Sequence, residues 1–374
     1  MRTSTVWWTD LHTRPGRSLL AKFEQLLVAA GIDTIDVAHK FVAIKIHFGE
    51  PGNLAYIRPN YARTLVSMLQ QRKAIPFLTD CNTLYKGRRA NAVDHLQSAW
   101  ENGFEPLTIG CPIIIADGLK GTDQRDIPTG CRHCPTAHIG SAIADADIII
   151  SMNHFKGHEL TGIGGALKNI GMGSGSVPGK LAMHSDSKPT IREQHCTGCG
   201  QCERNCAHDA IHVNSGKASI DYVRCVGCGQ CIAVCMFRAA VPRWDSKTTQ
   251  EKIMEYAKAV LTGKPSFHIN FVTSVSPNCD CNADNDIPLV HDLGIAASFD
   301  PVALDQACAD MVNAAPVNPA SSIAEAWMRA DSHRTDSQPD KFTLAQPRTD
   351  WRLGLAYAEE IGLGSRNYQL EILH

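Results

Sequence analysis

The sequence predicts an α/β protein whose mostly parallel sheet is flanked by helices and whose chain is interrupted by a small cysteine-rich domain. Two observations indicate this: short apolar segments alternate with amphipathic ones, as in sheets covered by helices on both faces, and two similar cysteine runs lie close together in the middle of the chain. We expect residues 1–187 and 244–374 to form the α/β domain, with residues 188–243 as the insert.

Strands and helices are predicted in alternation before the insert. Apolar, β-branched runs predict strands at residues 41–48, 75–79, 112–116 and 147–151, and periodic apolar residues predict helices at 18–30, 59–73, 89–102 and 136–146. Leu19, Phe23 and Leu26 share one face of the first helix. Pro59 suits the first position of the second helix.

The same patterns continue after the insert. They predict helices at residues 248–261, 301–314, 320–330 and 351–360 and a strand at 267–273. The polar, proline-bearing residues 331–348 are expected to form an irregular surface connection.

Composition limits the class of protein. The 374 residues are 44% hydrophobic and 20% charged, which is typical of a globular protein. A formal net charge of -2 gives no electrostatic reason for nucleic-acid binding, which needs a basic face, so we expect no nucleic-acid partner. No apolar stretch approaches the ~18 residues that span a bilayer, and no signal-peptide pattern is seen. We therefore expect a cytoplasmic protein without a membrane partner.

Eight of the 15 cysteines lie in two runs with the spacing C-x₂-C-x₂-C-x₃-C. Three thiolates at this spacing bind one face of a cubane, and in two-cluster ferredoxins the fourth thiolate binds the other cluster. The alternative of two zinc sites is less consistent with the spacing, because zinc sites usually use separated C-x-x-C pairs. We interpret the insert as a ferredoxin-like (α+β) domain with two [4Fe–4S] clusters, whose ligands are Cys196, Cys199, Cys202 and Cys235 for one and Cys225, Cys228, Cys231 and Cys206 for the other.

The segment between the two runs predicts a hairpin about Asn214, Ser215 and Gly216. Proline, which commonly follows the fourth cysteine, is replaced by Ala207 and Met236. We expect no loss of a ligand from this departure.

Polar residues follow five of the predicted strands. They include His47 and Glu50, Asp80 to Asn82, Asp117, His154 to Glu159, and Asn278 to Cys281. Ligands of open α/β sheets bind beyond the carboxyl ends of the strands, so we expect a site at this edge.

Three motifs near this edge have alternative interpretations. His154 and His158 are four residues apart and form either a metal pair or polar contacts to substrate or clusters. Cys279 and Cys281 are either an additional metal or redox site or two ordinary half-buried thiols. The glycine-rich residues 162–179 form either a backbone nest for an anion or a flexible connection to the insert.

The segments KIHFGE, NTLYKGRR, NHFKGHEL with GIGGALKNIGMG, NCDCNADNDIP and SFDPVALDQA occur in this order. Together they resemble the uncharacterised iron–sulfur centre proteins of the domain-of-unknown-function family 362, in the version with an inserted two-cluster ferredoxin domain. The resemblance covers nearly the whole chain and implies an α/β fold and cluster binding, without a settled reaction. It marks as signature positions Lys45, His47, Glu50, His154, Lys156, His158, Glu159, Lys168, Asn169, Cys279 and Cys281.

The leading hypothesis is an iron–sulfur redox protein in which the two clusters relay single electrons to the strand-end site; it is an oxidoreductase if a substrate, which the sequence does not identify, reacts there. Lys45, Lys156 and Lys168 would hold a small anionic substrate, and His154 or His158 would move protons. Residues 194–243 contain five basic and three acidic residues, which suits either electron transfer within the chain or docking of an acidic redox partner protein. The second hypothesis is a non-enzymatic electron carrier or adaptor. It differs from the first in needing no polar cavity at the strand ends. Clusters with a purely structural role are the third hypothesis.

Overall fold

The computed structural model describes residues 3–85, 87–184, 188–227, 230–237, 239–242, 246–332 and 340–373. Its main sheet contains β1 (Ser4–Asp10), β2 (Phe41–Lys45), β3 (Ile75–Asp80), β4 (Ile113–Ile115), β7 (Ile148–His154), β14 (Ser266–Val272), β15 (Gly294–Ser298) and β16 (Tyr368–Ile372). The helices outside the insert are α1 (Leu19–Ala29), α2 (Pro59–Gln71), α3 (Ala92–Glu101), α4 (Pro106–Ile109), α5 (Ser141–Asp145), α6 (Ala166–Ser174), α7 (Val177–His184), α10 (Ser246–Leu261), α11 (Pro301–Ala314), α12 (Ala324–Ser332), α13 (Lys341–Ala345) and α14 (Trp351–Glu360), with a short 3₁₀ helix at Ile32–Thr34.

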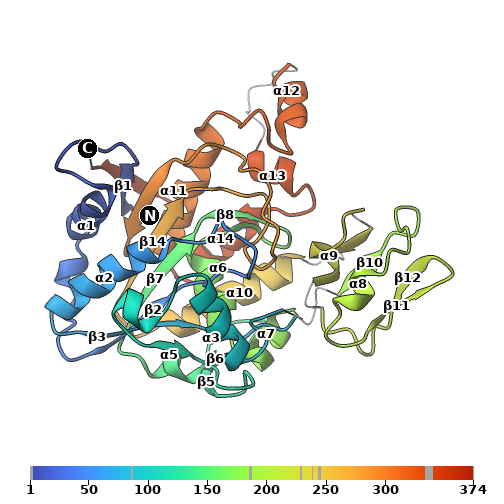
Figure 1. Ribbon diagram of the computed structural model, residues 1–374, viewed down its shortest axis with the longest axis horizontal. Coiled ribbons are helices and arrows are strands. Elements are labelled where there is room, and N and C mark those ends of the chain that lie inside the picture. Colours follow the sequence, from blue (N-terminus) through green and yellow to red (C-terminus); the bar gives the residue numbers. More distant parts are fainter. Residues whose placement is uncertain are drawn as a thin grey trace.

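The eight strands are arranged in the order β16-β1-β15-β14-β7-β2-β3-β4. All neighbouring pairs are parallel except those that β15 makes with β1 and β14. Strands from both sides of the insert are therefore joined in one sheet, with helices on both of its faces (Figure 1). This confirms the predicted α/β class and mostly parallel sheet.

The two faces of the sheet have separate apolar cores. Val42 and Ile44 of β2 pack with Phe23 of α1 and Leu65 of α2, whereas the intervening Ala43 packs with the α6, α10, α11 and α14 side. Successive residues of a strand point to opposite faces, so an unbroken apolar run fills both cores. All five strands that were predicted from such runs are present.

Several elements differ from the sequence prediction. Residues 136–146 were predicted as one helix, but β6 (Thr136–Gly140) pairs with β5 (Gln124–Pro128) and only α5 is helical. Residues 162–179 are not a flexible connection: β9 (Gly162–Gly164) pairs with β8 (Lys156–His158), and α6 follows, with the backbone N–H groups of Ala166 and Leu167 donating to the carboxylate of Asp305. The connection predicted at 331–348 contains α13, and residues 333–339 lie outside the described residues.

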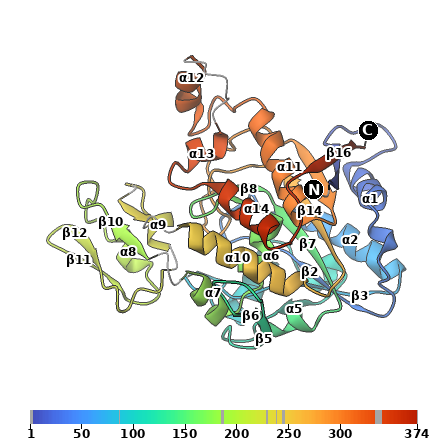
Figure 2. The ribbon, with the colours of Figure 1, turned by 180° about the vertical axis from the view of Figure 1, so that it is seen from behind.

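The inserted segment has its own secondary structure: β10 (Pro189–Ile191), α8 (Gln201–Arg204), β11 (Ile211–Asn214), β12 (Lys217–Ile220), α9 (Gln230–Ala233) and β13 (Ala240–Pro242). The predicted hairpin is present as β11 and β12, with Ser215 and Gly216 at positive φ in its turn. Figures 1 and 2 show the segment projecting from one side of the body, with α9 nearest to α10. Nowhere in the described ranges is there a helix with the length and apolarity needed to cross a bilayer.

Candidate functional site

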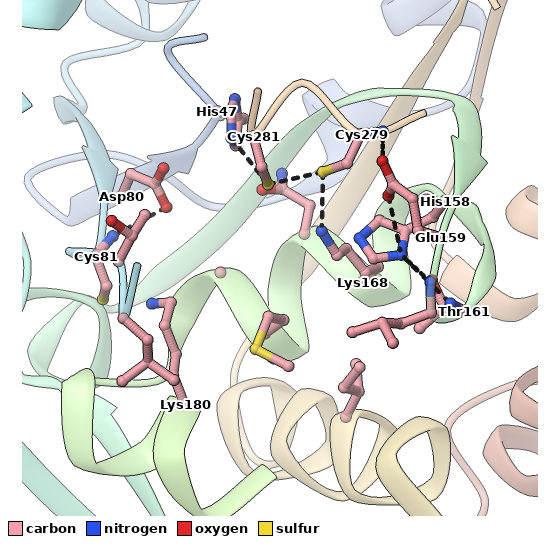
Figure 3. Close-up of a pocket in the computed structure, with 18 of the residues that line it drawn as sticks. His47, Asp80, Cys81, His158, Glu159, Thr161, Lys168, Lys180, Cys279 and Cys281 are labelled. Atoms are coloured by element: carbon pink, nitrogen blue, oxygen red, sulfur yellow. Dashed lines mark hydrogen bonds and ion pairs between the residues drawn. The ribbon is translucent and has the colours of Figure 1, made fainter. Parts of the chain in front are cut away.

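A pocket of about 120 Å³ lies at the carboxyl ends of β2, β3 and β7 and beside the loop that follows β14 (Figure 3). Its walls include the five side chains predicted to be catalytic and both predicted thiols: Lys45, His154, Lys156, His158, Lys168, Cys279 and Cys281. The polar residues after β4 are not part of this lining. Asp117 instead accepts hydrogen bonds from the backbone and side-chain amides of Asn82.

Lys45 is paired inside the pocket wall. Its Nζ lies 2.9 Å from Asp80 Oδ1 and donates to Asn169 Oδ1 at 2.6 Å, with the lysine and the aspartate both buried. Burial lowers the pKa of Lys45. Burial acts to raise the pKa of Asp80, but the neighbouring cations, led by Lys45, hold it well below its ordinary value. Lys45 is thus neutralised by the protein and is less suited to hold a substrate anion than the sequence suggested.

Asp280 organises a second part of the wall. Its carboxylate lies 2.8 Å from His154 Nδ1 and 2.7 Å from Lys156 Nζ. His154 Nε2 also lies 2.8 Å from the carbonyl oxygen of Thr273, so both nitrogens of this ring are engaged by the protein. This geometry disfavours the metal pair with His158 and gives His154 a structural contact to the β14 loop.

His158 is the second predicted proton carrier. Its Nδ1 accepts the Leu160 N–H at 3.1 Å. Burial, reinforced by the charge of Lys168, lowers the pKa of His158 to about 4. The ring is therefore neutral near pH 7 and has its Nε2 for contact with a ligand.

Cys279 and Cys281 lie beside Lys168 of α6. The two Sγ atoms are 2.7 Å apart, and Lys168 Nζ lies 3.4 Å from Cys279 Sγ. The hydrogen bond with Cys281 and then the charges of Lys168 and Lys156 outweigh burial and lower the pKa of the Cys279 thiol to about 6. Burial acts to lower the pKa of Lys168, but the charges of Cys279 and Cys281 outweigh it and raise this pKa. A cysteine thiolate near neutral pH is a nucleophile and a redox group.

Contacts on two sides hold the thiol pair and the loop that carries it in place. The Cys279 N–H donates to Glu159 Oε1 at 3.2 Å, and the intervening Asp280 is held by His154 and Lys156. On the opposite side, His47 Nε2 lies 3.9 Å from Cys281 Sγ and 2.8 Å from Arg89 Nη1.

Sequence reasoning missed several parts of the wall. Lys180 and His184 come from α7, Thr249 and Ile253 from α10, and Gln230 from α9 of the insert. None of them follows a strand, so the strand-end rule gives no signal for them.

The insert contains two small hollows lined by cysteines. Cys196, Cys199, Cys202 and Cys235 line one, and Cys206, Cys225 and Cys231 line the other, together with Gln230. Cys228 lies outside the described residues. Backbone N–H groups point at the sulfurs: Ala218 N lies 3.3 Å from Cys196 Sγ and Ala210 N 3.3 Å from Cys206 Sγ.

No three or more His, Cys, Asp or Glu side chains within the described ranges are grouped closely enough for a single metal ion. Sulfurs around one zinc ion lie about 3.8 Å apart, as follows from a Zn–S length of about 2.3 Å in a tetrahedron. A cubane of four irons keeps its thiolates farther apart.

The fold and the site define an α/β protein with a thiol-containing, cation-rich pocket at its strand ends and a cysteine-rich insert against that pocket. Residues 42–310 match the family described as "Domain of unknown function (DUF362)". The chain belongs to this family.

Two solved structures have distant similarity. The lactate racemase apoprotein from Thermoanaerobacterium thermosaccharolyticum matches with 13% identity and a TM-score of 0.40, over 80% of this chain and 54% of that one. A structural-genomics target from Thermotoga maritima matches with 11% identity and a TM-score of 0.38, over 80% of this chain and 60% of that one. This chain therefore matches less than two thirds of either structure. A search of curated proteins found no significant match.

Proposed function

We propose that this protein is an oxidoreductase in which two [4Fe–4S] clusters in the insert relay single electrons to the strand-end pocket. The observation that carries the proposal is the position of Gln230: this buried side chain lines both a cysteine hollow and the pocket. A cysteine-rich hollow that shares a wall with a polar pocket is the arrangement that short-range electron transfer requires.

The cysteines fit the two clusters in the exchanged pattern that the spacing predicts. Cys235 of the second run lies with three cysteines of the first run, and Cys206 of the first run lies with Cys225 and Cys231. Glycines bring the backbone close to the hollows, and N–H groups directed at thiolate sulfurs tune the potential of such clusters. When bound, each cluster would exchange one electron.

The second hollow is the inner one. The backbone of its cysteine run packs against the end of α7, since a Cβ added at Gly227 would lie 2.4 Å from the carbonyl oxygen of His184. His184 itself lines the pocket. We therefore assign the set of Cys206, Cys225, Cys228 and Cys231 as the cluster next to the pocket, and the other set as the one that meets the redox partner.

The pocket supports binding of a small anionic substrate. Lys168 contributes a half-buried cation whose contact in the pocket is a thiol rather than a carboxylate, unlike Lys45 and Lys156. Neutral His158 also lines the pocket, and because its Nδ1 accepts the Leu160 N–H, its Nε2 carries the hydrogen and can donate a hydrogen bond to a substrate anion. In this proposal Lys168 holds the substrate, and the ion pairs of Lys45 and Lys156 keep the strand ends rigid.

The two rival functions fit less well. An electron carrier or adaptor has no use for a buried pocket containing lysine, histidine and thiol groups, and purely structural clusters have no use for a shared wall with it. The 15 cysteines also favour a reducing compartment, so we place the protein in the cytoplasm with an acidic electron-transfer partner.

The test is anaerobic iron and sulfide analysis combined with EPR of the dithionite-reduced protein. About eight irons and eight sulfides per chain, with the spectrum of two interacting reduced centres, are expected, because each cubane contains four of each. Gln230→Leu should leave the iron content unchanged and slow reoxidation of the reduced protein by an electron acceptor that enters the pocket. Far fewer irons in protein never exposed to air would refute the proposal.

A further inference from the structure

We propose that Cys279 and Cys281 form a redox-active pair that cycles between a dithiol and an intramolecular disulfide, and that this pair converts two one-electron transfers into one two-electron reaction in the pocket. The inference deepens the proposed function and rests on it only for the source of the electrons. The pair itself is argued from the geometry of the β14 loop.

The distance between the two sulfurs favours a direct bond. They lie 2.7 Å apart. A disulfide requires about 2.05 Å, whereas two thiolates on one tetrahedral zinc lie about 3.8 Å apart. Closing the bond therefore needs a smaller movement than opening the pair around a metal ion.

The surroundings hold the loop in place without blocking this movement. Glu159 fixes the N–H of Cys279, and Asp280 between the cysteines is anchored by His154 and Lys156. Both sulfur-bearing residues line the pocket, so the pair faces the space where a substrate would bind (Figure 3). Lys168, at 3.4 Å from Cys279 Sγ, stabilises the negative charge that appears when the bond breaks.

The electron balance matches the cofactors that the insert is proposed to hold. Cleavage of the S–S bond takes two electrons and one proton and leaves a thiolate at Cys279 and a thiol at Cys281. Two one-electron [4Fe–4S] donors, each oxidised by one electron, supply that number. The Cys279 thiolate and the Cys281 thiol then pass both electrons, together with the Cys281 proton, to the small anionic substrate, which is thereby reduced by two electrons, and the sulfurs close again to the disulfide.

The chain offers a matched control in Cys131 and Cys134. This pair is also close in sequence, but Cys131 Sγ contacts the carbonyl oxygen of Thr129 at 3.4 Å, and Cys134 N donates to Glu255. Neither cysteine lines the strand-end pocket.

The test is an anaerobic reductive titration of the holoprotein after oxidation with diamide and removal of the oxidant. We expect about four electrons per chain for the wild type and for Cys131→Ser/Cys134→Ser, two for the clusters and two for the disulfide. The double variant Cys279→Ser/Cys281→Ser should take up about two. Iron is measured in each sample. Alkylation of the oxidised wild type followed by mass spectrometry shows directly whether Cys279 and Cys281 form a disulfide.

Each outcome decides the question. If the wild type takes up only two electrons, and both Cys279 and Cys281 are alkylated after oxidation, the proposed disulfide is refuted. The proposal of two clusters would then be unaffected. An additional non-cluster metal that is lost only from the Cys279→Ser/Cys281→Ser variant would also refute the disulfide. Low iron with protected Cys279 and Cys281 would refute the relay and retain the disulfide. If the double variant does not fold, the wild-type alkylation result alone still decides.

Discussion

Lys156 Nζ and Asp280 Oδ2 form an ion pair with a separation of 2.7 Å. Both side chains are buried, with exposed fractions of 7% and 1%. The pair joins β8, directly after the central strand β7, to the loop that presents the two pocket thiols. Because His154 contacts the same carboxylate, a single acidic residue fixes the relative positions of two segments more than a hundred residues apart in sequence.

Asp280→Asn should destabilise the protein strongly. It keeps the shape of the side chain but leaves Lys156 as a buried cation without its counter-charge, and removing one partner of a buried pair costs about 3–5 kcal/mol. The measurement is the apparent denaturation midpoint under anaerobic conditions. Asp36→Asn is the control, because Asp36 pairs with Lys40 on the surface and little change is expected there. Equal midpoints for both variants would contradict the structural role of Asp280.

The reactivity of reduced Cys279 should follow a pKa near 6 rather than the ordinary thiol value of 9.0. Its rate of alkylation by iodoacetamide, followed by mass spectrometry, is expected to reach half its plateau at about pH 6. Since the pKa is lower in the folded state, ionised Cys279 stabilises the reduced protein fully above pH 9, and this stabilisation is lost as the pH falls through 6. Lys168→Met should move the midpoint upward, and an unchanged midpoint would mean that Lys168 is not the stabilising charge.

Serine substitutions in the insert should fall into two groups that cross the two cysteine runs. Cys206→Ser should perturb the same EPR signal as Cys225→Ser, and Cys235→Ser the same signal as Cys196→Ser, because these residues share hollows. Grouping by position in the sequence, with Cys206 matching Cys196, would contradict the exchanged assignment. Each variant is compared at equal protein concentration with its iron content determined.

Gly171→Ala should be destabilising because α6 packs directly on α10 at this point. An added Cβ would lie 2.2 Å from the carbonyl oxygen of Ile253, which belongs to a helix backbone and cannot move aside easily. Overpacking of this kind costs about 1–3 kcal/mol. Gly164→Ala is the control, since its Cβ would meet only Lys156 atoms at 3.7 Å or more. Comparable denaturation midpoints for the two alanine variants would show that the helices can separate without cost.

The strands that could be predicted are those with long apolar runs. β1, β15 and β16 do not follow from the sequence patterns, and the physical reasons for β15 and β16 differ. β15 reads Gly-Ile-Ala-Ala-Ser, and its small residues have little strand propensity. They are needed because a Cβ on Gly294 would lie 2.2 Å from the carbonyl oxygen of Thr9 in β1. β16 is an edge strand with half-buried and exposed residues, so it lacks a strong apolar pattern.

Tertiary contacts explain the other errors. Residues 136–140 extend because β6 pairs along its full length with β5, which overrides a helical pattern. The glycines after residue 162 are typical of a loop or of a backbone nest for an anion. Several of them instead permit close contact, as Gly173 does with Lys45, where a Cβ would lie 2.5 Å from Nζ.

The site could be predicted as far as the strands determine it. The residues after β2, β3, β7 and β14 were identified because parallel strands end at one edge of a sheet. The partners that neutralise Lys45 and Lys156 depend on side-chain geometry that sequence spacing does not encode. Gln230 belongs to another part of the chain, and only the docking of the insert brings it to the pocket.

The strands that lead into and out of the insert, β10 and β13, pair with each other, with Thr190 opposite Val241. The chain thus leaves the α/β body and returns to it through two adjacent, paired strands, which lie about 4.8 Å apart. A gap of that width can be closed by a tight turn. The insert therefore has the connectivity of an exchangeable cassette: a single genetic insertion or excision could add or remove both proposed clusters without changing the strand order of the main sheet.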